Sequence, residues 1–194
     1  MHNTPAATPI EGQNFTSEDF SHTSIEGRFF THCTFRGCNF SEANLCNAKF
    51  CEVVFVGCNF SRAKVEGCRF HSVQFEDCKL EGIEFFKLDK TFFSVSFKNC
   101  LLRYCNFSDL NMKNTAFCKS KLTENHFTHT CLAGADFTEV DLSGTHFHHC
   151  DLSTANLATA TRYDIDPQTN IIKQAKFSFP EAMSLLKGFE IVLE

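Results

Sequence analysis

The sequence has no tryptophan, only two tyrosines and only four prolines among its 194 residues. It lacks a stretch of 18 consecutive apolar residues, so we expect no membrane-spanning helix. Its first residues, MHNTPAATPIEGQ, lack the basic start and the apolar run of a secretory signal. We therefore expect a disordered tail over residues 1–12. Twelve cysteines without such a signal indicate reduced thiols and a cytoplasmic protein.

Sequence motifs of known catalytic chemistry are missing as well. The chain contains no GxSxG, no P-loop, no dinucleotide-binding glycine motif and no HExxH. It also has no CxxC pair, which makes zinc-binding and redox functions of the cysteines unexpected. We therefore predict a protein that is not an enzyme and that binds no cofactor.

Positive charge is scarce in the last third of the chain. Residues 1–130 hold 14 Lys or Arg and 14 Asp or Glu, whereas residues 131–194 hold 4 and 9. The net charge of −5 therefore lies in the last third. Residues 131–161 contain four acidic residues and no basic one: Asp136, Glu139, Asp141 and Asp151. Such a region repels nucleic acid and attracts a basic surface, so we expect no direct nucleic acid binding.

Phenylalanine, in contrast, is abundant, and it recurs with a period of five. Every fifth residue from Phe15 to Phe85 is apolar, and so is every fifth residue from Phe92 to Leu157. Of these 29 central positions, 18 are Phe. The gap of seven between Phe85 and Phe92 indicates a two-residue insertion near residues 86–91. A period of five fits neither a helix nor a strand. It predicts a chain that turns after each five residues, four times per coil.

A coil of 20 residues explains a second regularity. Residues 20 apart are alike, provided that two residues are skipped after position 85. One column at the position two before each centre holds Cys38, Cys58, Cys78 and Cys100. The central column that we expect to form the structural core ladder is Phe15, Phe35, Phe55, Phe75, Phe97, Phe117 and Phe137. We predict parallel coils stacked in register, about seven in number.

The repeated units CNFSEANL, CNFSRAKV and AGADFTEVDLSG resemble the pentapeptide-repeat family. The resemblance covers residues 13–161. It implies an all-β solenoid, the right-handed quadrilateral parallel β-helix of that family, with a filled interior.

The last segment, residues 162–194, departs from the repeat. DPQTN is a turn signal, FPEAMSLLKG predicts a short helix with Pro180 early and Gly188 just after it, and FEIVLE predicts a short strand. The segment is either a cap over the last coil or a homodimer interface. We favour the dimer, with interface residues Phe179, Ala182, Leu185, Leu186, Phe189 and Ile191. Four of these, from Ala182 to Phe189, have the spacing of one α-helical face.

The run NFTSEDFSHTSIEGRFFTHCTFRGCNF, the insertion and the helical tail resemble the Qnr-type, quinolone-resistance branch of the family. That resemblance implies a cytosolic homodimer that mimics duplex DNA and binds a type II topoisomerase, DNA gyrase or topoisomerase IV. Plasmid-type members carry projecting loops that matter for drug protection, and this chain has only the two-residue insertion. The alternative is a protein-binding scaffold with no topoisomerase role.

The acidic residues have two interpretations. Asp136, Asp141 and Asp151 directly precede centres of the last coils, on three different faces, and Glu139 lies nearby. They form a candidate partner-binding acidic belt for the Lys and Arg residues that normally hold DNA phosphates. Alternatively, they only solvate the surface.

Five histidines lie at outward positions of one face: His126, His129, His146, His148 and His149. Stacked imidazoles could share Zn²⁺ or Ni²⁺ or titrate together at about pH 6. Because no carboxylate or cysteine completes a tetrahedral set, we expect no metal site. Eight cysteines take the inward position two before a centre and behave as small hydrophobes: Cys33, Cys38, Cys58, Cys68, Cys78, Cys100, Cys105 and Cys150. The outward cysteines are Cys46, Cys51, Cys118 and Cys131.

Overall fold

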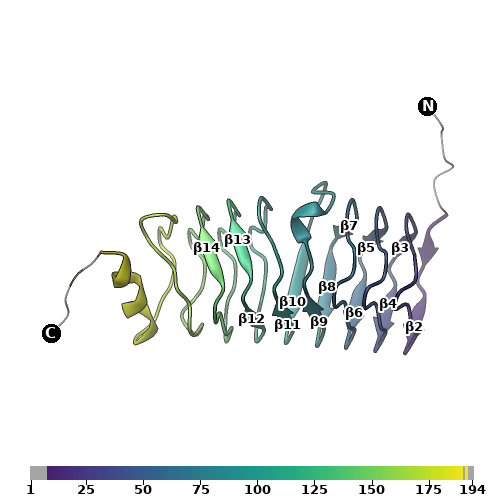
Figure 1. The fold of residues 1–194 in the computed structure, drawn as a ribbon, viewed down its shortest axis with the longest axis horizontal. Helices are drawn as coiled ribbons and strands as arrows, with labels where there is room; N and C mark the ends of the chain where they lie inside the picture. The colour runs from purple at the N-terminus through teal and green to yellow at the C-terminus, as the bar shows by residue number, and fades with distance from the viewer. Residues whose placement is uncertain (1–7, 190, 192–194) are drawn as a thin grey trace.

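The computed structural model describes residues 8–189 and residue 191. These residues form a straight rod, wound as a right-handed parallel β-solenoid of about seven turns (Figure 1). The predicted quadrilateral all-β fold is confirmed. The first and the last of the described coils lie at opposite ends of the rod, so position along the sequence is also position along the rod.

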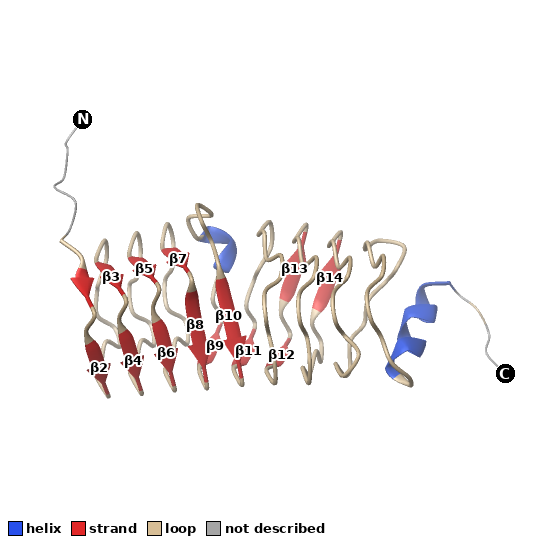
Figure 2. Ribbon diagram, turned by 180° about the vertical axis from the view of Figure 1, so that it is seen from behind, coloured by secondary structure: helices blue, strands red, loops and turns tan. Residues whose placement is uncertain are grey.

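Four faces, numbered here in chain order, run along the rod. The first holds β1 (Ile10–Glu11), β3 (Phe29–Thr31), β5 (Lys49–Cys51) and β7 (Arg69–His71). The second holds β2 (Asn14–Thr16), β4 (Thr34–Arg36), β6 (Val54–Val56), β8 (Val73–Glu76) and β10 (Val95–Lys98), which lie side by side in Figure 2. The third holds β9 (Lys79–Glu81), β11 (Leu101–Arg103) and β12 (Lys121–Thr123). The fourth holds β13 (His126–Thr128) and β14 (His146–His148).

Pairing is parallel throughout these sheets, with Phe35 opposite both Phe15 and Phe55. Where no strand forms, single bridges such as Asn39 with Asn59 keep the same spacing. Two 3₁₀ helices complete the described structure. They are η1 (Phe85–Lys87), and η2 (Glu181–Phe189) at the C-terminal end of the rod (Figure 1).

The interior is filled by columns of stacked side chains. The column from Phe15 to Phe137 is one continuous stack, with successive ring centroids 4.5–5.3 Å apart. Neighbouring columns meet edge to face, as Phe35 and Phe40 do at 5.4 Å. Each fully buried ring contributes about 1.5–3 kcal/mol relative to exposure. Because every coil repeats these contacts, the stabilisation is spread evenly along the rod.

Two kinds of turn connect the faces. In a closed turn, the N–H two before a centre donates to the carbonyl of the preceding centre, as Cys68 does to Val65 at 2.9 Å. The described open turns lack this bond. There the Phe35 carbonyl accepts from the Cys58 thiol of the next coil, at 3.5 Å. The inward cysteines that donate in this way are Cys33, Cys38, Cys58, Cys78, Cys100, Cys105 and Cys150. These cysteines are thus hydrogen-bond donors as well as small hydrophobes.

The insertion lies later than the sequence indicates. Asp89 still faces Arg69, 20 residues away, whereas the Ser94 hydroxyl accepts from the N–H of Ser72, 22 residues away. The two extra residues therefore lie between Asp89 and Ser94, in the loop that follows η1 (Figure 1). The prediction that Phe92 is an inward centre is wrong. Its side chain is 74% exposed and its φ is 56°, because Phe92 occupies a turn, and Phe93 packs against the core instead.

The C-terminal segment continues the coils before it departs from them. Ile171 pairs with Asp151, and Lys176 pairs with Asn156. The predicted helix is η2, a 3₁₀ helix that includes Gly188 instead of ending before it. A 3₁₀ helix has three residues per turn, so the expected single apolar face is divided. Leu185 packs against the core, whereas the Phe189 side chain is exposed. The strand predicted over residues 189–194 lies outside the described residues, except for Phe189 and Ile191.

Candidate functional site

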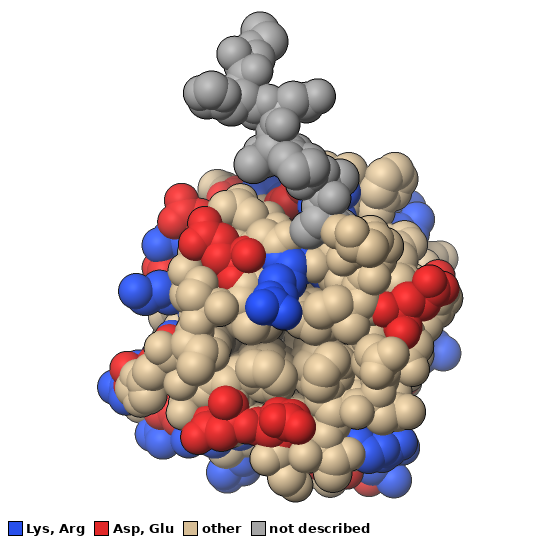
Figure 3. Space-filling view, turned by 90° about the vertical axis from the view of Figure 1, so that its right-hand side faces the viewer, with Lys and Arg blue, Asp and Glu red and all other residues tan. Residues whose placement is uncertain are grey.

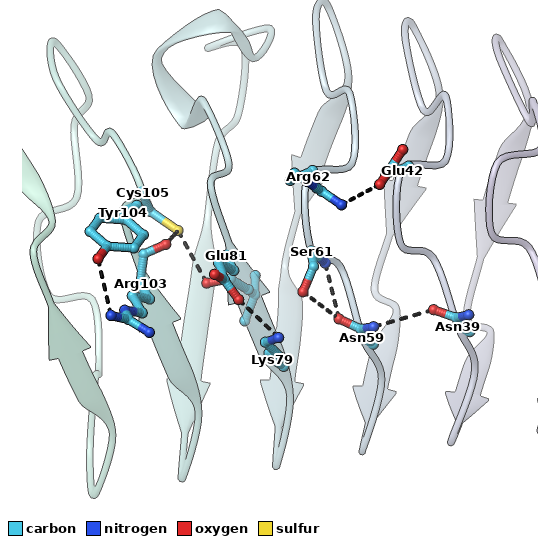
Figure 4. A network of polar contacts seen from close by, with 11 residues as sticks. Asn39, Glu42, Asn59, Ser61, Arg62, Lys79, Glu81, Arg103, Tyr104 and Cys105 are labelled. Atoms are coloured by element: carbon cyan, nitrogen blue, oxygen red, sulfur yellow. Dashed lines mark hydrogen bonds and ion pairs between the residues drawn. The ribbon is translucent and has the colours of Figure 1, made fainter.

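Columns of polar side chains cover the outside of the rod and join neighbouring coils. The Asn59 side-chain oxygen accepts from the Ser61 N–H at 3.1 Å, and the Asn59 amide donates to Asn39 at 3.4 Å (Figure 4). Arg62 forms an ion pair with Glu42 of the preceding coil (Figure 4). The side chain of a polar residue directly before a centre can therefore cap the turn that follows it and form a hydrogen bond with the neighbouring coil.

Three members of the acidic belt cap the turns that follow them in this way. Their side-chain oxygens accept from the backbone N–H two residues later, at 3.0 Å for Asp136, 3.1 Å for Asp141 and 2.9 Å for Asp151. Each carboxylate thus stabilises local structure whether or not it binds a partner. Aspartate can be replaced by asparagine without loss of this acceptor, because an amide oxygen accepts as a carboxylate does.

Asp136 is the best-connected carboxylate of the belt. Besides Thr138, it accepts from the Asn156 amide at 3.2 Å and from the Cys118 thiol at 3.3 Å. Burial raises the pKa of Asp136, but the hydrogen bonds from Thr138, Cys118 and Asn156 outweigh it and leave the pKa below its usual value. Asp136 therefore holds a negative charge at neutral pH on the second face.

Asp141 faces a cation that the sequence analysis did not include. Arg162 donates to it with two nitrogens, the Nε at 2.9 Å. Burial raises the pKa of Asp141, whereas hydrogen bonds from Ser143 and Arg162 lower it, and the net shift is downward. Arg162 lies one residue beyond the stretch without basic residues. Its place beside Asp141 depends on how the last coil is closed.

The remaining two carboxylates are different from each other. Glu139 has Lys119 Nζ at 3.9 Å, in a pair that is largely exposed to solvent. Asp151 has no ion pair with a Lys or Arg among residues 8–189 and 191. The other end of the rod carries both signs of charge, as the N-terminal view in Figure 3 shows. The charge of the predicted acidic belt is therefore partly neutralised, and among the described residues Asp136 and Asp151 form no ion pair with a Lys or Arg.

The five histidines lie together on the fourth face. Ring centroids of His126 and His146 are 5.3 Å apart, and so are those of His129 and His149. The rings of His148 and His149 are 4.0 Å apart. In the described part of the chain, no three His, Cys, Asp or Glu side chains are arranged to hold a metal ion.

The C-terminal end exposes several large apolar side chains. Phe179 is 80% exposed, and Phe189 and Ile191 are about half exposed. Met183, which the sequence analysis did not include, is also exposed. Ala182, Leu185 and Leu186 are half-buried. The six predicted interface residues thus divide between the cap and the open surface.

No helix among the described residues is long and apolar enough to cross a membrane. The described clefts are open surface features, and the interior of the coils is occupied by side chains. The candidate site residues described above do not include a nucleophile paired with a base, and similarity to known proteins indicates no catalytic family.

Two family models match the chain. A pentapeptide repeat region matches residues 28–89, and pentapeptide repeats in eight copies match residues 120–157. No curated protein sequence matches. A trypsin-treated form of QnrB1, a plasmid-mediated fluoroquinolone resistance protein, is similar at 21% identity and a TM-score of 0.47, over 100% of this chain and 95% of that one.

Two further solved structures are similar. HetL, a pentapeptide repeat protein involved in heterocyst differentiation regulation in Nostoc, has 17% identity and a TM-score of 0.34, over 87% of this chain and 86% of its own. A pentapeptide repeat protein of the Arabidopsis thaliana thylakoid lumen has 21% identity and a TM-score of 0.27, over 66% and 68%. At these identities the likeness concerns the fold alone.

Proposed function

The chain belongs to the pentapeptide-repeat family, and from that premise we propose that it binds a type II topoisomerase, either DNA gyrase or topoisomerase IV. In this proposal the rod takes the place of duplex DNA on the enzyme. It thereby alters the inhibition of the enzyme by quinolones or toxins. The observation that carries the proposal is a straight rod whose negative charge is concentrated toward one end.

A DNA-binding surface offers Lys and Arg side chains to a regular row of phosphates, and these contacts dominate its affinity. A stiff rod with carboxylates fixed by hydrogen bonds can present negative charge to the same surface without ordering cost. Asp136 and Asp151 supply such fixed charges, because the side chain of each accepts a hydrogen bond from the backbone N–H two residues later. Glu139 adds a solvent-exposed charge at the turn that follows Phe137, with Lys119 beside it.

The proposal includes a homodimer joined through the C-terminal ends. Phe179, Met183, Phe189 and Ile191 are exposed there, and a second copy would cover them. Two rods joined in this way would place their acidic regions next to each other. Phe189→Glu should convert the dimer to a monomer in analytical ultracentrifugation, whereas Phe92→Glu, at a more exposed site far from the end, should not.

Gyrase supercoiling with purified protein, with and without ciprofloxacin, tests the proposal. Lysine at Asp136 and Asp151 would disturb the turns as well as the charge. Asp136→Asn with Asp151→Asn is the sharper variant, since it keeps the acceptors. Asp19→Asn is the matched control, because the Asp19 side chain accepts the same kind of hydrogen bond, from the Ser21 N–H, at the other end of the rod. We expect the double variant to lose its effect on gyrase and the control to keep it.

One observation favours the alternative, a protein-binding scaffold with no topoisomerase role. Arg162 neutralises Asp141, and Lys119 lies beside Glu139, so the belt carries less charge than the sequence indicates. If a large molar excess of wild-type protein leaves both supercoiling and drug-induced cleavage unchanged, the topoisomerase proposal fails and the scaffold remains.

A further inference from the structure

The fourth face ends in a cleft between β14 and η2. His146 and His148 of β14 line one side of it, and Asp164 and Asp166 of the last coil line the other. The cleft has a volume of about 390 Å³, and Lys187 and Ser184 of η2 complete its wall. Neither pair of side chains has a role in the proposed function.

The two carboxylates reach this position because the last coil is locally shortened. Thr161 pairs with Asp141, 20 residues away, but Asp164 pairs with His146, 18 residues away. Asp166 therefore lies beside His148 in the same register. A constant spacing of 20 does not place these residues together. The carboxylates that the sequence analysis found missing beside the histidines are thus supplied by the shortened coil.

We propose that this cleft is a binding site for a divalent transition metal ion such as Zn²⁺, with His146, His148, Asp164 and Asp166 as ligands. Alternate residues on a strand are about 6.6 Å apart, and neighbouring coils are about 4.8 Å apart. The four side chains thus project from the corners of a small rectangle. An ion above its centre lies within reach of all four, and imidazole nitrogens with carboxylate oxygens are a donor set that Zn²⁺ accepts.

The four proposed ligand side chains have to change conformation when an ion binds. As they are placed, no three of the described His, Cys, Asp or Glu side chains form a group that could hold a metal ion, so the donors have to move before an ion binds. His146, His148 and Asp164 are exposed, so rotation about their side-chain bonds is not blocked by packing. Asp166 is half-buried and its Oδ1 accepts from the Gln168 N–H at 2.8 Å, which leaves its Oδ2 for an ion. The Asp164 side chain is 76% exposed. Its partner is Lys187, whose Nζ lies 3.5 Å from Asp164 Oδ1. Lys187 therefore occupies the position of a cation, and a metal ion has to compete with it.

A second feature of the wall points to a ligand in the cleft. The Ser184 hydroxyl is buried and has no hydrogen-bond partner among the described residues. A buried polar group without a partner is uncommon, and an ordered water is one usual explanation. Metal ions held by protein side chains commonly retain such a water. A water on the proposed ion would give Ser184 its partner.

The other histidines of the face provide the controls. His126 and His129 belong to β13 and the turn after it, one coil away from the cleft. They resemble His146 and His149 in type and exposure but have no part in the cleft lining. A site that depends on Asp164 and Asp166 will not need them. Adventitious binding to the histidine stack will.

Isothermal titration calorimetry of the full chain with ZnCl₂ tests the proposal, and visible absorption with Co²⁺ reports the coordination. We expect one ion per chain. His148→Ala and Asp166→Asn should each weaken binding by about tenfold or more, since each removes a ligand. His129→Ala should leave the affinity unchanged. Lys187→Met should tighten binding, because it removes the competing cation, and misfolding cannot produce such a gain.

Three results would overturn the proposal. The first is a flat calorimetric trace with wild-type protein. The second is a loss of affinity in His129→Ala equal to that in His148→Ala, which identifies binding to the histidine stack alone. The third is an unchanged affinity in both Asp166→Asn and Lys187→Met, which removes the last coil from the site. Gyrase supercoiling assayed with and without Zn²⁺ separates this proposal from the topoisomerase proposal, since either can fail alone.

Discussion

Arg162 holds Asp141 of the preceding coil through two nitrogens, its Nε lying 2.9 Å from Oδ1. The Asp141 side chain is mostly buried in this pair, whereas that of Arg162 is mostly exposed. The pair joins the third face of the last coils and removes one unit of negative charge from the acidic belt. It therefore links the stability of the C-terminal end to its electrostatics.

Arg162→Gln should destabilise the protein at neutral pH by less than about 1 kcal/mol, because the arginine is largely solvated. The folded-state pKa of Asp141 lies below its ordinary value, so its contribution is present above the unfolded pKa and is lost as pH falls through the folded pKa. Urea unfolding of both proteins at neutral and acidic pH checks this. The difference should shrink in acid, and a constant difference would contradict the account.

Asp89 should titrate well below an ordinary aspartate. Hydrogen bonds from Arg69 and Thr91 lower the pKa of Asp89 from 3.8 to about 2. Its stabilising contribution is complete above pH 3.8 and disappears as pH falls through about 2. Carboxyl ¹³C NMR titration of Arg69→Gln should show the pKa of Asp89 rising toward its ordinary value. The pKa of Asp19, which is lowered mainly by Ser21, is the internal control and should not move.

The thiol hydrogen bonds of the open turns can be separated from packing. The Cys100 thiol donates to the Phe75 carbonyl at 3.3 Å in an open turn, whereas Cys68 lies in a closed turn. Both side chains are buried. Cys100→Ala should therefore cost about 1 kcal/mol more than Cys68→Ala in chemical denaturation. Cys100→Ser keeps a donor and should recover part of the difference. Equal costs for the two alanine variants would show that the sulfur atoms only fill space.

The two phenylalanines on either side of the insertion boundary should respond oppositely to substitution. Phe97 is buried between Phe75 and Phe117, at 5.3 Å from each, so Phe97→Ala should cost about 3–5 kcal/mol. Phe92 is exposed with a left-handed φ of 56°. Asparagine tolerates this conformation better, so Phe92→Asn should change stability by less than about 1 kcal/mol, in the stabilising direction. A large loss for Phe92→Asn in thermal unfolding would mean that the loop packs differently.

The repeat predicts the fold because one rule governs 29 central positions at once. A period of five with columns 20 apart leaves few other arrangements for so many phenylalanines, and the register of Phe35 with Phe15 and Phe55 follows from it. The rule fails where the chain departs from the repeat. The spacing of five selects Phe92, which lies five residues before Phe97, but the geometry of the loop turns the ring of Phe93 inward instead.

The candidate sites were less predictable because they depend on the irregular last coil. The spacing between paired residues falls from 20 at Thr161 to 18 at Asp164 and is 20 again at Ile171. This local shortening brings Asp164 beside His146 and directs Arg162 outward to Asp141. Likewise, the sequence predicts one α-helical face for the cap, whereas the 3₁₀ geometry of η2 separates the packed Leu185 from the exposed Phe189. A regular repeat does not predict where a coil is locally shortened or whether a helix is α or 3₁₀.

The stack from Phe15 to Phe137 has a geometric consequence beyond stability. Its equal steps make the molecule a graduated ruler, on which outward groups of one column are spaced by whole multiples of about 4.8 Å. Duplication of one 20-residue unit would lengthen the ruler by one division and leave both ends as they are. The number of coils between two surface groups of one column therefore sets the distance between them, and insertion or deletion of whole coils changes this distance in discrete steps.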